Sequence, residues 1–227
     1  MTISENIAAV QANIAAAEAA AGRQPGSVTL VAATKTQSSD TIRAAIAAGV
    51  RVCGENRVQE LTAHLEDYAY DGAAVHFIGH LQTNKVKYVV GRVELIESVS
   101  SDKLLQAIDA QAAKLGIVQD ILLEINIGRE ESKSGYPPEE ALPAALRAAA
   151  LDHVRLRGLM AIPPALPGES SRFFAEMGKL FVDIRCALGD NKKDVTHLSM
   201  GMSADYQEAV AQGATLVRVG TALFGPR

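Results

Sequence analysis

Short runs of β-branched and other apolar residues alternate with longer alanine-rich segments of helical period along the whole chain. Eight of these runs predict strands, at residues 28–33, 50–53, 75–78, 95–99, 121–127, 156–160, 195–198 and 216–219. Helices are predicted between them, at residues 39–48, 55–67, 83–90, 102–115, 138–149, 170–188 and 204–211, after an amphipathic helix over residues 3–21. Strands joined by single crossover helices run parallel, which leaves either an open doubly wound sheet or a closed eight-stranded barrel.

We expect the closed form, a (β/α)8 or TIM barrel of the α/β class with an extra N-terminal helix. Eight strands in 227 residues match that architecture. A flavodoxin-like open sheet remains the alternative. No low-complexity linker interrupts the chain, so we predict one domain over residues 1–227.

Composition argues against several classes of protein. The chain has 26 Asp and Glu against 22 Lys and Arg, a net charge of −4, whereas a nucleic-acid-binding domain usually has a basic excess. Its two cysteines, Cys53 and Cys186, are too few for a disulfide framework, so we expect a reducing, cytoplasmic environment. The N-terminus has no basic region typical of a signal peptide, and no run of 18 apolar residues predicts a membrane span.

Lys35 is the most informative single residue. It follows the apolar run over residues 28–33 and should therefore point into or just above the barrel mouth, where the chemistry of such barrels gathers. Loss of hydration there lowers the pKa of a lysine, and a neutral amine can attack an aldehyde to form a Schiff base. The alternative is a lysine whose amine simply reaches solvent at a strand end. The position of Lys35 alone favours neither of these two interpretations.

The segments after the last two predicted strands favour a phosphate site. Ser199, Met200, Gly201 and Ser203 lead into a helix predicted to begin near Ala204, so that hydroxyls and backbone N–H groups would meet at a helix N-terminus. At the end of the eighth strand, Gly220 would let the backbone come close to a phosphate, and Thr221 would add a further hydroxyl donor. The alternative is simple capping of that helix by Ser203.

A lysine amine that can react with an aldehyde, opposite a phosphate site, matches pyridoxal 5′-phosphate (PLP). This cofactor carries an aldehyde and a phosphate on one ring. Arg218, two residues before Gly220, would lie beside that ring. An arginine keeps its proton in proteins, so it can donate a hydrogen bond to the pyridine nitrogen but leaves that nitrogen unprotonated. An unprotonated ring is a poor electron sink, unlike the ring of enzymes that place an aspartate there. No metal site is predicted.

Several segments together resemble the pyridoxal phosphate homeostasis proteins of the YggS/PROSC type, and the resemblance runs almost end to end. Two positions depart from the family's usual residues, because Val75 stands where members often have Trp and Cys53 where they often have an aromatic residue or glycine. The matching segments are residues 31–35 (VAATK), 54–60 (GENRVQE), 76–85 (HFIGHLQTNK), 133–135 (KSG), 157–160 (RGLM), 198–205 (LSMGMSAD) and 217–221 (VRVGT).

The resemblance implies a fold type III barrel of the alanine racemase N-terminal kind, with the cofactor on Lys35. It also implies phosphate contacts from the 199–203 segment and from Gly220 and Thr221, with Arg218 at the ring nitrogen. Asn56 lies in a matching motif and is expected to contact the ring or its hydroxyl. We interpret His80 as a hydrogen-bonded rim histidine. Lys133 is interpreted as part of a solvated charged turn, with a second, mobile amine for the aldehyde as the other hypothesis.

Two functions follow from different classes of protein. The family resemblance favours a cytoplasmic, monomeric protein that binds PLP, buffers or delivers it in vitamin B6 homeostasis, and has cofactor-free PLP enzymes as recipients. The alternative is an amino-acid racemase, which needs a second base opposite Lys35. In alanine racemases a tyrosine from a second domain supplies it; here the chain ends just past the eighth strand, and none of the five tyrosines is an obvious substitute. A cofactor-free Schiff-base aldolase ranks last, because it has no use for Arg218 beside a phosphate segment.

Overall fold

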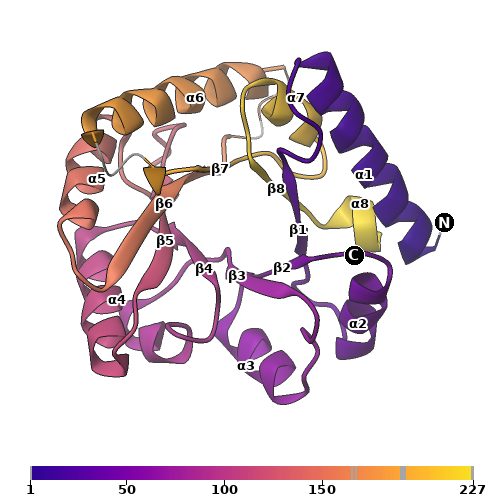
Figure 1. The fold of residues 1–227 in the computed structure, drawn as a ribbon, viewed down its shortest axis with the longest axis horizontal. Helices are drawn as coiled ribbons and strands as arrows, with labels where there is room; N and C mark the ends of the chain where they lie inside the picture. The colour runs from indigo at the N-terminus through magenta and orange to yellow at the C-terminus, as the bar shows by residue number, and fades with distance from the viewer. Residues whose placement is uncertain (1, 165, 167, 190–192, 226–227) are drawn as a thin grey trace.

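Eight parallel strands close into a barrel in chain order, with β1 paired to β8, as Figure 1 shows in a view down the barrel. The structure, a computed structural model, describes residues 2–164, 166, 168–189 and 193–225. The predicted barrel is confirmed, and the open sheet is excluded because β8 returns to β1. The strands are β1 (Thr29–Ala33), β2 (Val52–Glu55), β3 (Ala74–Phe77), β4 (Leu95–Val99), β5 (Gln119–Ile125), β6 (Val154–Ala161), β7 (His197–Ser199) and β8 (Leu216–Val219).

Helices form an outer ring around the strands (Figure 1). Polar N-cap side chains start several of them, such as Ser38 before α2 and Ser101 before α4, each of which accepts a backbone N–H of the first turn. The helices are α1 (Ile3–Ala20), α2 (Ser39–Ala47), α3 (Val58–Glu66), the 3-10 helix η1 (Thr83–Tyr88), α4 (Asp102–Leu115), the 3-10 helix η2 (Pro138–Glu140), α5 (Ala141–Ala149), α6 (Ser170–Ala187), α7 (Tyr206–Ala211) and α8 (Thr221–Phe224).

The N-terminal helix α1 completes the outer ring where the helix after β8 is short. Because α8 has only 4 residues, it cannot cover β8 and β1 alone, and α1 with its 18 residues lies along that side (Figure 1). Asn6 Nδ2 donates to Leu223 O at 2.9 Å, and Asn13 Nδ2 donates to the Tyr206 hydroxyl at 3.1 Å. These bonds join α1 to α8 and to α7.

Two apolar layers follow from the alternation of side chains along each strand. On β5, Ile121 and Leu123 pack outward against the helices, whereas Leu122 between them faces the barrel interior. Strands that are covered on both faces need apolar residues on both, which is why they read as continuous apolar runs. The interior layer comprises Val31, Ala33, Val52, Ile78, Leu95, Leu122, Met160 and Leu216.

Most predicted boundaries differ from the observed ones by a few residues, and two of the differences have a clear physical reason. The second strand runs over Val52–Glu55, and α3 begins at Val58, because Glu55 is fully buried in the strand, where its carboxylate accepts hydrogen bonds. The helix predicted over residues 83–90 is the 3-10 helix η1, which ends at Tyr88. The buried residues Val86 and Val89 lie three apart, which fits the three residues per turn of a 3-10 helix.

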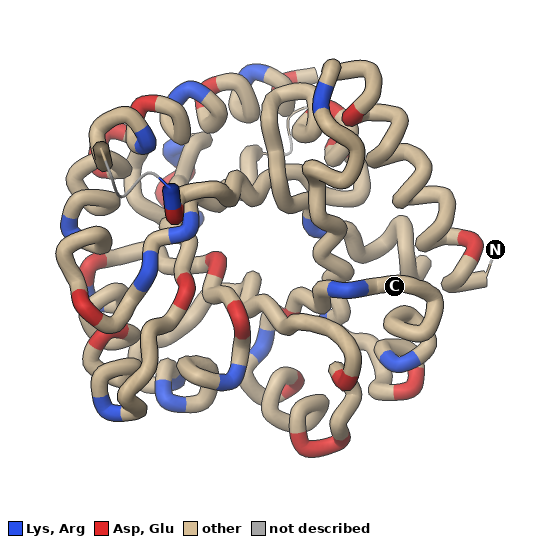
Figure 2. Tube along the Cα trace, viewed as in Figure 1, with Lys and Arg blue, Asp and Glu red and all other residues tan. Residues whose placement is uncertain are grey.

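Charged residues of both signs are interspersed around the ring of helices, as Figure 2 shows. Within the described part of the chain, none of the helices combines the length and the apolar character that crossing a membrane requires.

Candidate functional site

Lys35 sits in a tight turn directly after β1. Gln37 N donates to Thr34 O at 3.0 Å, and Thr36 has a φ of 65°, so residues 34–37 form a type II turn with Thr36 at its third position. A β-branched residue rarely adopts a positive φ, so surrounding contacts must hold Thr36 there. Thr36 N donates to Glu60 Oε2 at 3.0 Å. The turn presents Lys35 to a cleft at the carboxyl end of the barrel, as the sequence predicts.

A buried acid network supports this turn from β2 and α3. Glu55 Oε2 accepts the Tyr70 hydroxyl at 3.1 Å, and Glu55 Oε1 accepts Asn56 N at 2.8 Å. Burial raises the pKa of Glu55 above its ordinary value, and the nearby Glu60 carboxylate adds to that rise. Burial also opposes the charge on Glu60, but the N–H of Thr36, with Glu55 and Arg57, keeps the pKa of Glu60 low. The charged acceptor therefore faces the strained residue beside Lys35.

The cleft has a volume of about 300 Å³, at the lower end of the usual range for small-molecule sites. Its wall includes apolar side chains, among them Ile78, Ile162 and Phe224, which can flank an aromatic ring. Six of the residues predicted from the sequence line it together: Lys35, Asn56, Ser203, Arg218, Gly220 and Thr221.

The segment between β7 and α7 differs from the predicted helix start. The helix begins at Tyr206 rather than near Ala204, and Asp205 Oδ1 accepts Met202 N at 2.7 Å in the preceding turn. Ser203 does not cap this helix. Its Oγ accepts Gly220 N at 3.1 Å and Ala222 N at 3.3 Å, which ties the segment to the end of β8. Because Ser203 Oγ is the acceptor in both bonds, its hydroxyl hydrogen can be donated to an oxygen atom of a ligand.

Ser199, Met200 and Gly201 lie behind the wall of the cleft, although the sequence groups them with Ser203. Ser199 and Met200 are both fully buried. Gly201 has a φ of 91°, and a Cβ added there would lie 2.5 Å from Ala209 Cβ. Only glycine therefore allows the segment to pack this closely on α7. These residues shape the cleft and support its wall, and the side chains that face it come from neighbouring positions.

Arg218 is held inside the barrel by acceptors from other strands. Its Nη2 donates to Ala161 O at 2.8 Å, and its Nη1 donates to Ser199 Oγ. Ser199 Oγ in turn donates to Glu97 Oε2 at 2.5 Å, and His76 Nδ1 donates to Glu97 Oε1 at 2.7 Å. These residues come from β8, β7, β4 and β3, and all four side chains are buried. We call His76, Glu97, Ser199 and Arg218 the interior array.

The interior array is charged. Burial opposes ionisation of Glu97, but His76, Arg218 and Ser199 outweigh it and keep the pKa of Glu97 below its ordinary value. Burial likewise disfavours the charged form of His76, yet Glu94 and Glu97 raise its pKa to about 9. Burial lowers the pKa of Arg218, although arginine stays protonated in proteins. A histidinium, a carboxylate and a guanidinium are therefore linked inside the barrel at neutral pH.

A further buried acid, Glu124 on β5, lies at the barrel mouth. Burial raises the pKa of Glu124 to about 7, and the nearby charge of Arg218 only partly opposes that rise. Glu124 lines a cavity of about 160 Å³ that adjoins the main cleft at Ile162 and is also lined by Lys133 and Ser134. Lys133 Nζ is 2.6 Å from Glu130 Oε1 and donates to Pro163 O at 3.4 Å.

His80 and Asn56 have different surroundings. The exposed His80 shares a hydrogen bond with Ser134 through Nδ1 at 3.0 Å, as expected of a rim histidine. Asn56 faces the main cleft, and its Oδ1 is buried without a hydrogen-bond partner among the described residues. An orphaned buried amide oxygen is costly unless a ligand or water completes it. Together with the amine of Lys35 and the hydroxyls of Ser203 and Thr221, this atom fits a ligand with an aldehyde, a ring hydroxyl and a phosphate.

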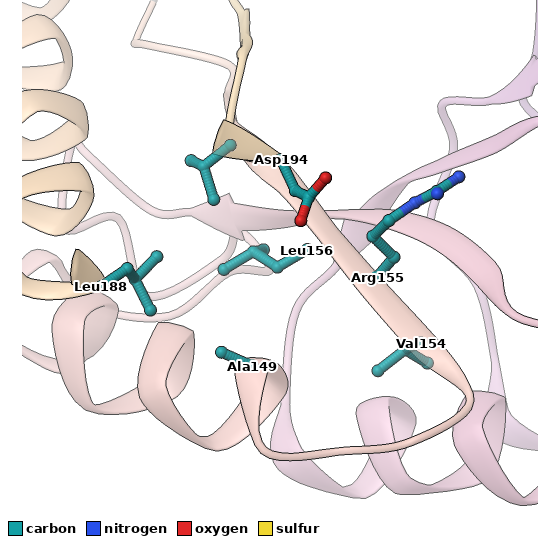
Figure 3. Close-up of a pocket in the computed structure, with 7 residues that line it drawn as sticks. Ala149, Val154, Arg155, Leu156, Leu188 and Asp194 are labelled. Atoms are coloured by element: carbon teal, nitrogen blue, oxygen red, sulfur yellow. The ribbon is translucent and has the colours of Figure 1, made fainter. Parts of the chain in front are cut away.

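A third cavity, of about 160 Å³, lies toward the amino-terminal end of the strands, and Figure 3 shows residues that line it. It lies beside the start of β6, at Val154 and Arg155, and beside the ends of two outer helices. Figure 3 shows leucine, valine and alanine side chains facing it, with Asp194 and Arg155 at its edge. Arg155 is already paired with Asp120 at 2.6 Å. This end of a barrel usually serves stability, so the Lys35 cleft is the candidate functional site.

Sequence reasoning missed the buried members of this site, namely Glu55, His76, Glu97 and Glu124. Each had a visible signal, since a charged or titratable residue interrupts an apolar strand whose neighbours are buried on both sides. The partners of these residues lie on other strands, far away in the sequence, and could not be assigned before the barrel closed.

The alanine racemase N-terminal domain family matches residues 6–227 of this chain. Among solved structures, alanine racemase of Clostridium difficile 630 superimposes with a TM-score of 0.73 at 14% identity, covering 95% of this chain and 55% of that chain. This likeness concerns the fold. The fold and the Lys35 cleft thus define a barrel of the alanine racemase N-terminal class.

Two other proteins are more similar in sequence, and the similarity covers nearly the whole length of both chains. The pyridoxal phosphate homeostasis protein of Aquifex aeolicus is 40% identical over 229 residues, which cover 100% of this chain and 99% of the relative. PipY of Synechococcus elongatus PCC7942, solved with PLP bound, is 34% identical with a TM-score of 0.84, covering 99% of this chain and 100% of that one. The chain belongs to the pyridoxal phosphate homeostasis protein family.

Proposed function

We propose that this protein binds PLP covalently through Lys35 and holds it for PLP homeostasis, as a buffer or as a donor. The carrying observation is that one cleft is lined by Lys35, Asn56, Ser203 and Thr221, and that Asn56 Oδ1 is buried without a hydrogen-bond partner among the described residues. PLP supplies an aldehyde, a phosphate and an electron-withdrawing ring. The Lys35 amine condenses with the aldehyde, forming a C=N bond and releasing one water. PipY, a relative with PLP bound, supports the assignment.

The remaining residues have distinct roles in this proposal. Ser203 and Thr221 donate hydroxyl hydrogens to the phosphate, and Gly220 lets the backbone come close to it. Asn56 lies beside the ring and its hydroxyl. Arg218 donates to the ring nitrogen but cannot protonate it, which keeps the ring a weak electron sink. A weak electron sink suits holding the cofactor better than using it in amino-acid chemistry.

The tyrosines support holding over racemisation. A racemase needs a second base across the cleft from Lys35, yet no tyrosine lines the cleft among the described residues. The hydroxyls of Tyr70, Tyr136 and Tyr206 are hydrogen-bonded to other side chains. Tyr68 and Tyr88 are exposed. Weak or absent racemase turnover is therefore our expectation.

We further infer a cytoplasmic monomer that releases PLP to cofactor-free PLP enzymes. Every residue assigned to the cofactor comes from one chain, so the site needs no second copy. Both thiols are free, with Cys53 buried and Cys186 exposed, which suits a reducing compartment.

A transfer assay separates holding from catalysis. The protein is loaded with PLP, freed of excess cofactor, and mixed with a cofactor-free PLP enzyme whose regained activity is followed over time. Racemisation of L- and D-alanine by the loaded protein is measured in parallel. We expect stoichiometric loading, transfer to the recipient and no appreciable racemisation.

Lys35→Ala is the test variant, and Lys87→Ala, at an exposed position of η1, is the matched control. Lys35→Ala is expected to lose covalent loading, whereas Lys87→Ala should load and transfer like the wild type. Sustained turnover of either alanine enantiomer by the wild-type protein would instead make it a racemase. A wild-type protein that takes up no PLP would refute the proposed function.

A further inference from the structure

The direction of every hydrogen bond in the interior array is fixed by chemistry. A guanidinium only donates, so Ser199 Oγ must accept from Arg218 Nη1 and can use its own hydrogen only toward Glu97. Glu97 accepts on both oxygens, from Ser199 and from His76. Hydrogen bonds are thus donated in one direction, from Arg218 to Ser199 and from Ser199 to Glu97. His76 donates a further hydrogen bond to the same carboxylate.

Arg218 is held on both terminal nitrogens. Ser199 accepts from Nη1, the carbonyl of Ala161 accepts from Nη2 at 2.8 Å, and Glu97 Oε2 lies 3.7 Å from Nη1. The Arg218 side chain is only 4% exposed and Glu97 is fully buried. Water therefore cannot replace these acceptors, and a guanidinium bound this way keeps one orientation.

Charge balance explains why His76 belongs to the array. Glu97 faces both buried cations, Arg218 and His76. The second carboxylate is Glu94, whose Oε1 lies 3.7 Å from His76 Nε2 on the far side of the ring and whose side chain is 66% exposed. Glu94 and Glu97 therefore both face His76, while Glu97, with Glu124 and Asp205 farther off, balances Arg218. Removing Glu97 would remove the one carboxylate shared by both cations and leave buried positive charge poorly compensated, a costly state.

We propose that His76, Glu97 and Ser199 are positioning residues for Arg218: they fix its guanidinium so that it donates to the ring nitrogen of the cofactor and keeps that nitrogen unprotonated. This inference rests on the proposed function, because it concerns the same cleft. None of the three positioning residues lines the cleft; each acts through Arg218. His76, Glu97 and Ser199 thereby influence the electronic character of a cofactor that they do not touch.

The first experiment uses the protein without cofactor. In wild-type protein, the side-chain 15N–1H signals of Arg218 should show resolved Nη groups, because both are bound and rotate slowly. Ser199→Ala removes one acceptor without changing the charge, and Glu97→Gln removes the counter-charge. Both variants should merge or broaden these signals. Unchanged Arg218 signals in Ser199→Ala would overturn the proposal, even if Glu97→Gln fails to fold.

The second experiment uses PLP labelled with 15N at the ring nitrogen. In the wild-type complex, the ring 15N shift should stay in the unprotonated range between pH 8 and pH 6. In Ser199→Ala and Glu97→Gln it should move toward the protonated range as the pH falls, with PLP affinity reduced about tenfold. A merely structural role would lower the melting temperature and leave the ring shift unchanged, which would refute positioning.

Glu94→Gln is the matched control, because the exposed Glu94 carboxylate contacts His76 but neither Arg218 nor the acceptors that hold it. It should leave both the Arg218 signals and the ring shift as in the wild type. If Glu94→Gln changed the ring 15N shift as much as Glu97→Gln does, the orientation of Arg218 would not be the cause. The loss of a negative charge near the cofactor would then explain both results. If wild-type protein takes up no PLP, the proposed function fails, while the cofactor-free Arg218 signals still test the positioning.

Discussion

Replacing His76 with asparagine should remove most of the pH dependence of stability between pH 6.5 and pH 9.5. His76 is buried between Glu94 and Glu97, and its Nδ1 donates to Glu97 at 2.7 Å. Asparagine places an amide donor near the position of Nδ1 but does not titrate. The variant therefore keeps a donor to Glu97 and loses the buried positive charge.

The magnitude follows from the pKa of His76, which rises from its ordinary 6.5 to about 9 in the folded protein. A raised native pKa means that the folded state binds the proton more tightly, so this stabilisation is complete below pH 6.5 and is lost as the pH rises through about 9. At about 1.4 kcal/mol per pH unit, the interval corresponds to about 3 kcal/mol. Because the His76 side chain is only 4% exposed, solvent screening reduces this figure little.

Urea unfolding of the cofactor-free protein at pH 6.5, 8 and 9.5 measures the effect. The wild type should lose about 3 kcal/mol more than His76→Asn over this range. Comparing two proteins cancels groups that titrate alike in both, and the neighbours that face His76 are Glu94, Glu97 and His197. Parallel stability curves for the two proteins would show that His76 is neutral when folded and would refute the charge assignment.

Two other substitutions test the supports of the barrel and of the cleft. Glu18 is buried and accepts Gly26 N at 3.0 Å and Val28 N at 2.7 Å, so Glu18→Ala should lower the free energy of unfolding by about 2–4 kcal/mol, measured by urea titration. A loss below about 0.5 kcal/mol would contradict this. Gly201→Ala would place a Cβ 2.5 Å from Ala209 Cβ and shift the segment that carries the predicted phosphate contacts. Its PLP affinity, measured by titration, should fall at least about tenfold, and wild-type affinity would contradict the role assigned to the segment.

The barrel was predictable because its signals are local. Each strand is an apolar run of a few residues, and two of the eight, β4 and β8, have the predicted boundaries. Lys35 could be placed as well, since a strand end in a parallel barrel fixes which end of the molecule its side chain reaches. Boundaries shifted where polar residues join a strand, as at Glu55, because burial of a carboxylate depends on partners that lie elsewhere in the chain.

The interior array was not predictable from the same patterns. Its members lie on four strands, and Glu97 and Ser199 are 102 positions apart in the sequence. Ser199 shows the difficulty most clearly. Its place before Ser203 suggested a phosphate contact, yet the alternation of side chains along β7 turns its hydroxyl inward to Glu97. A mid-strand acid such as Glu97 is the signal that points to such an array.

The central claim is that Lys35 carries the cofactor, and reduction with borohydride tests it most directly. Protein incubated with PLP is reduced, digested and analysed by peptide mass, with absorption spectra recorded before and after. We predict a yellow protein that bleaches on reduction and carries one phosphopyridoxyl group, located on Lys35. A protein that stays colourless with excess PLP, or an adduct found at full occupancy on another lysine, would contradict the account.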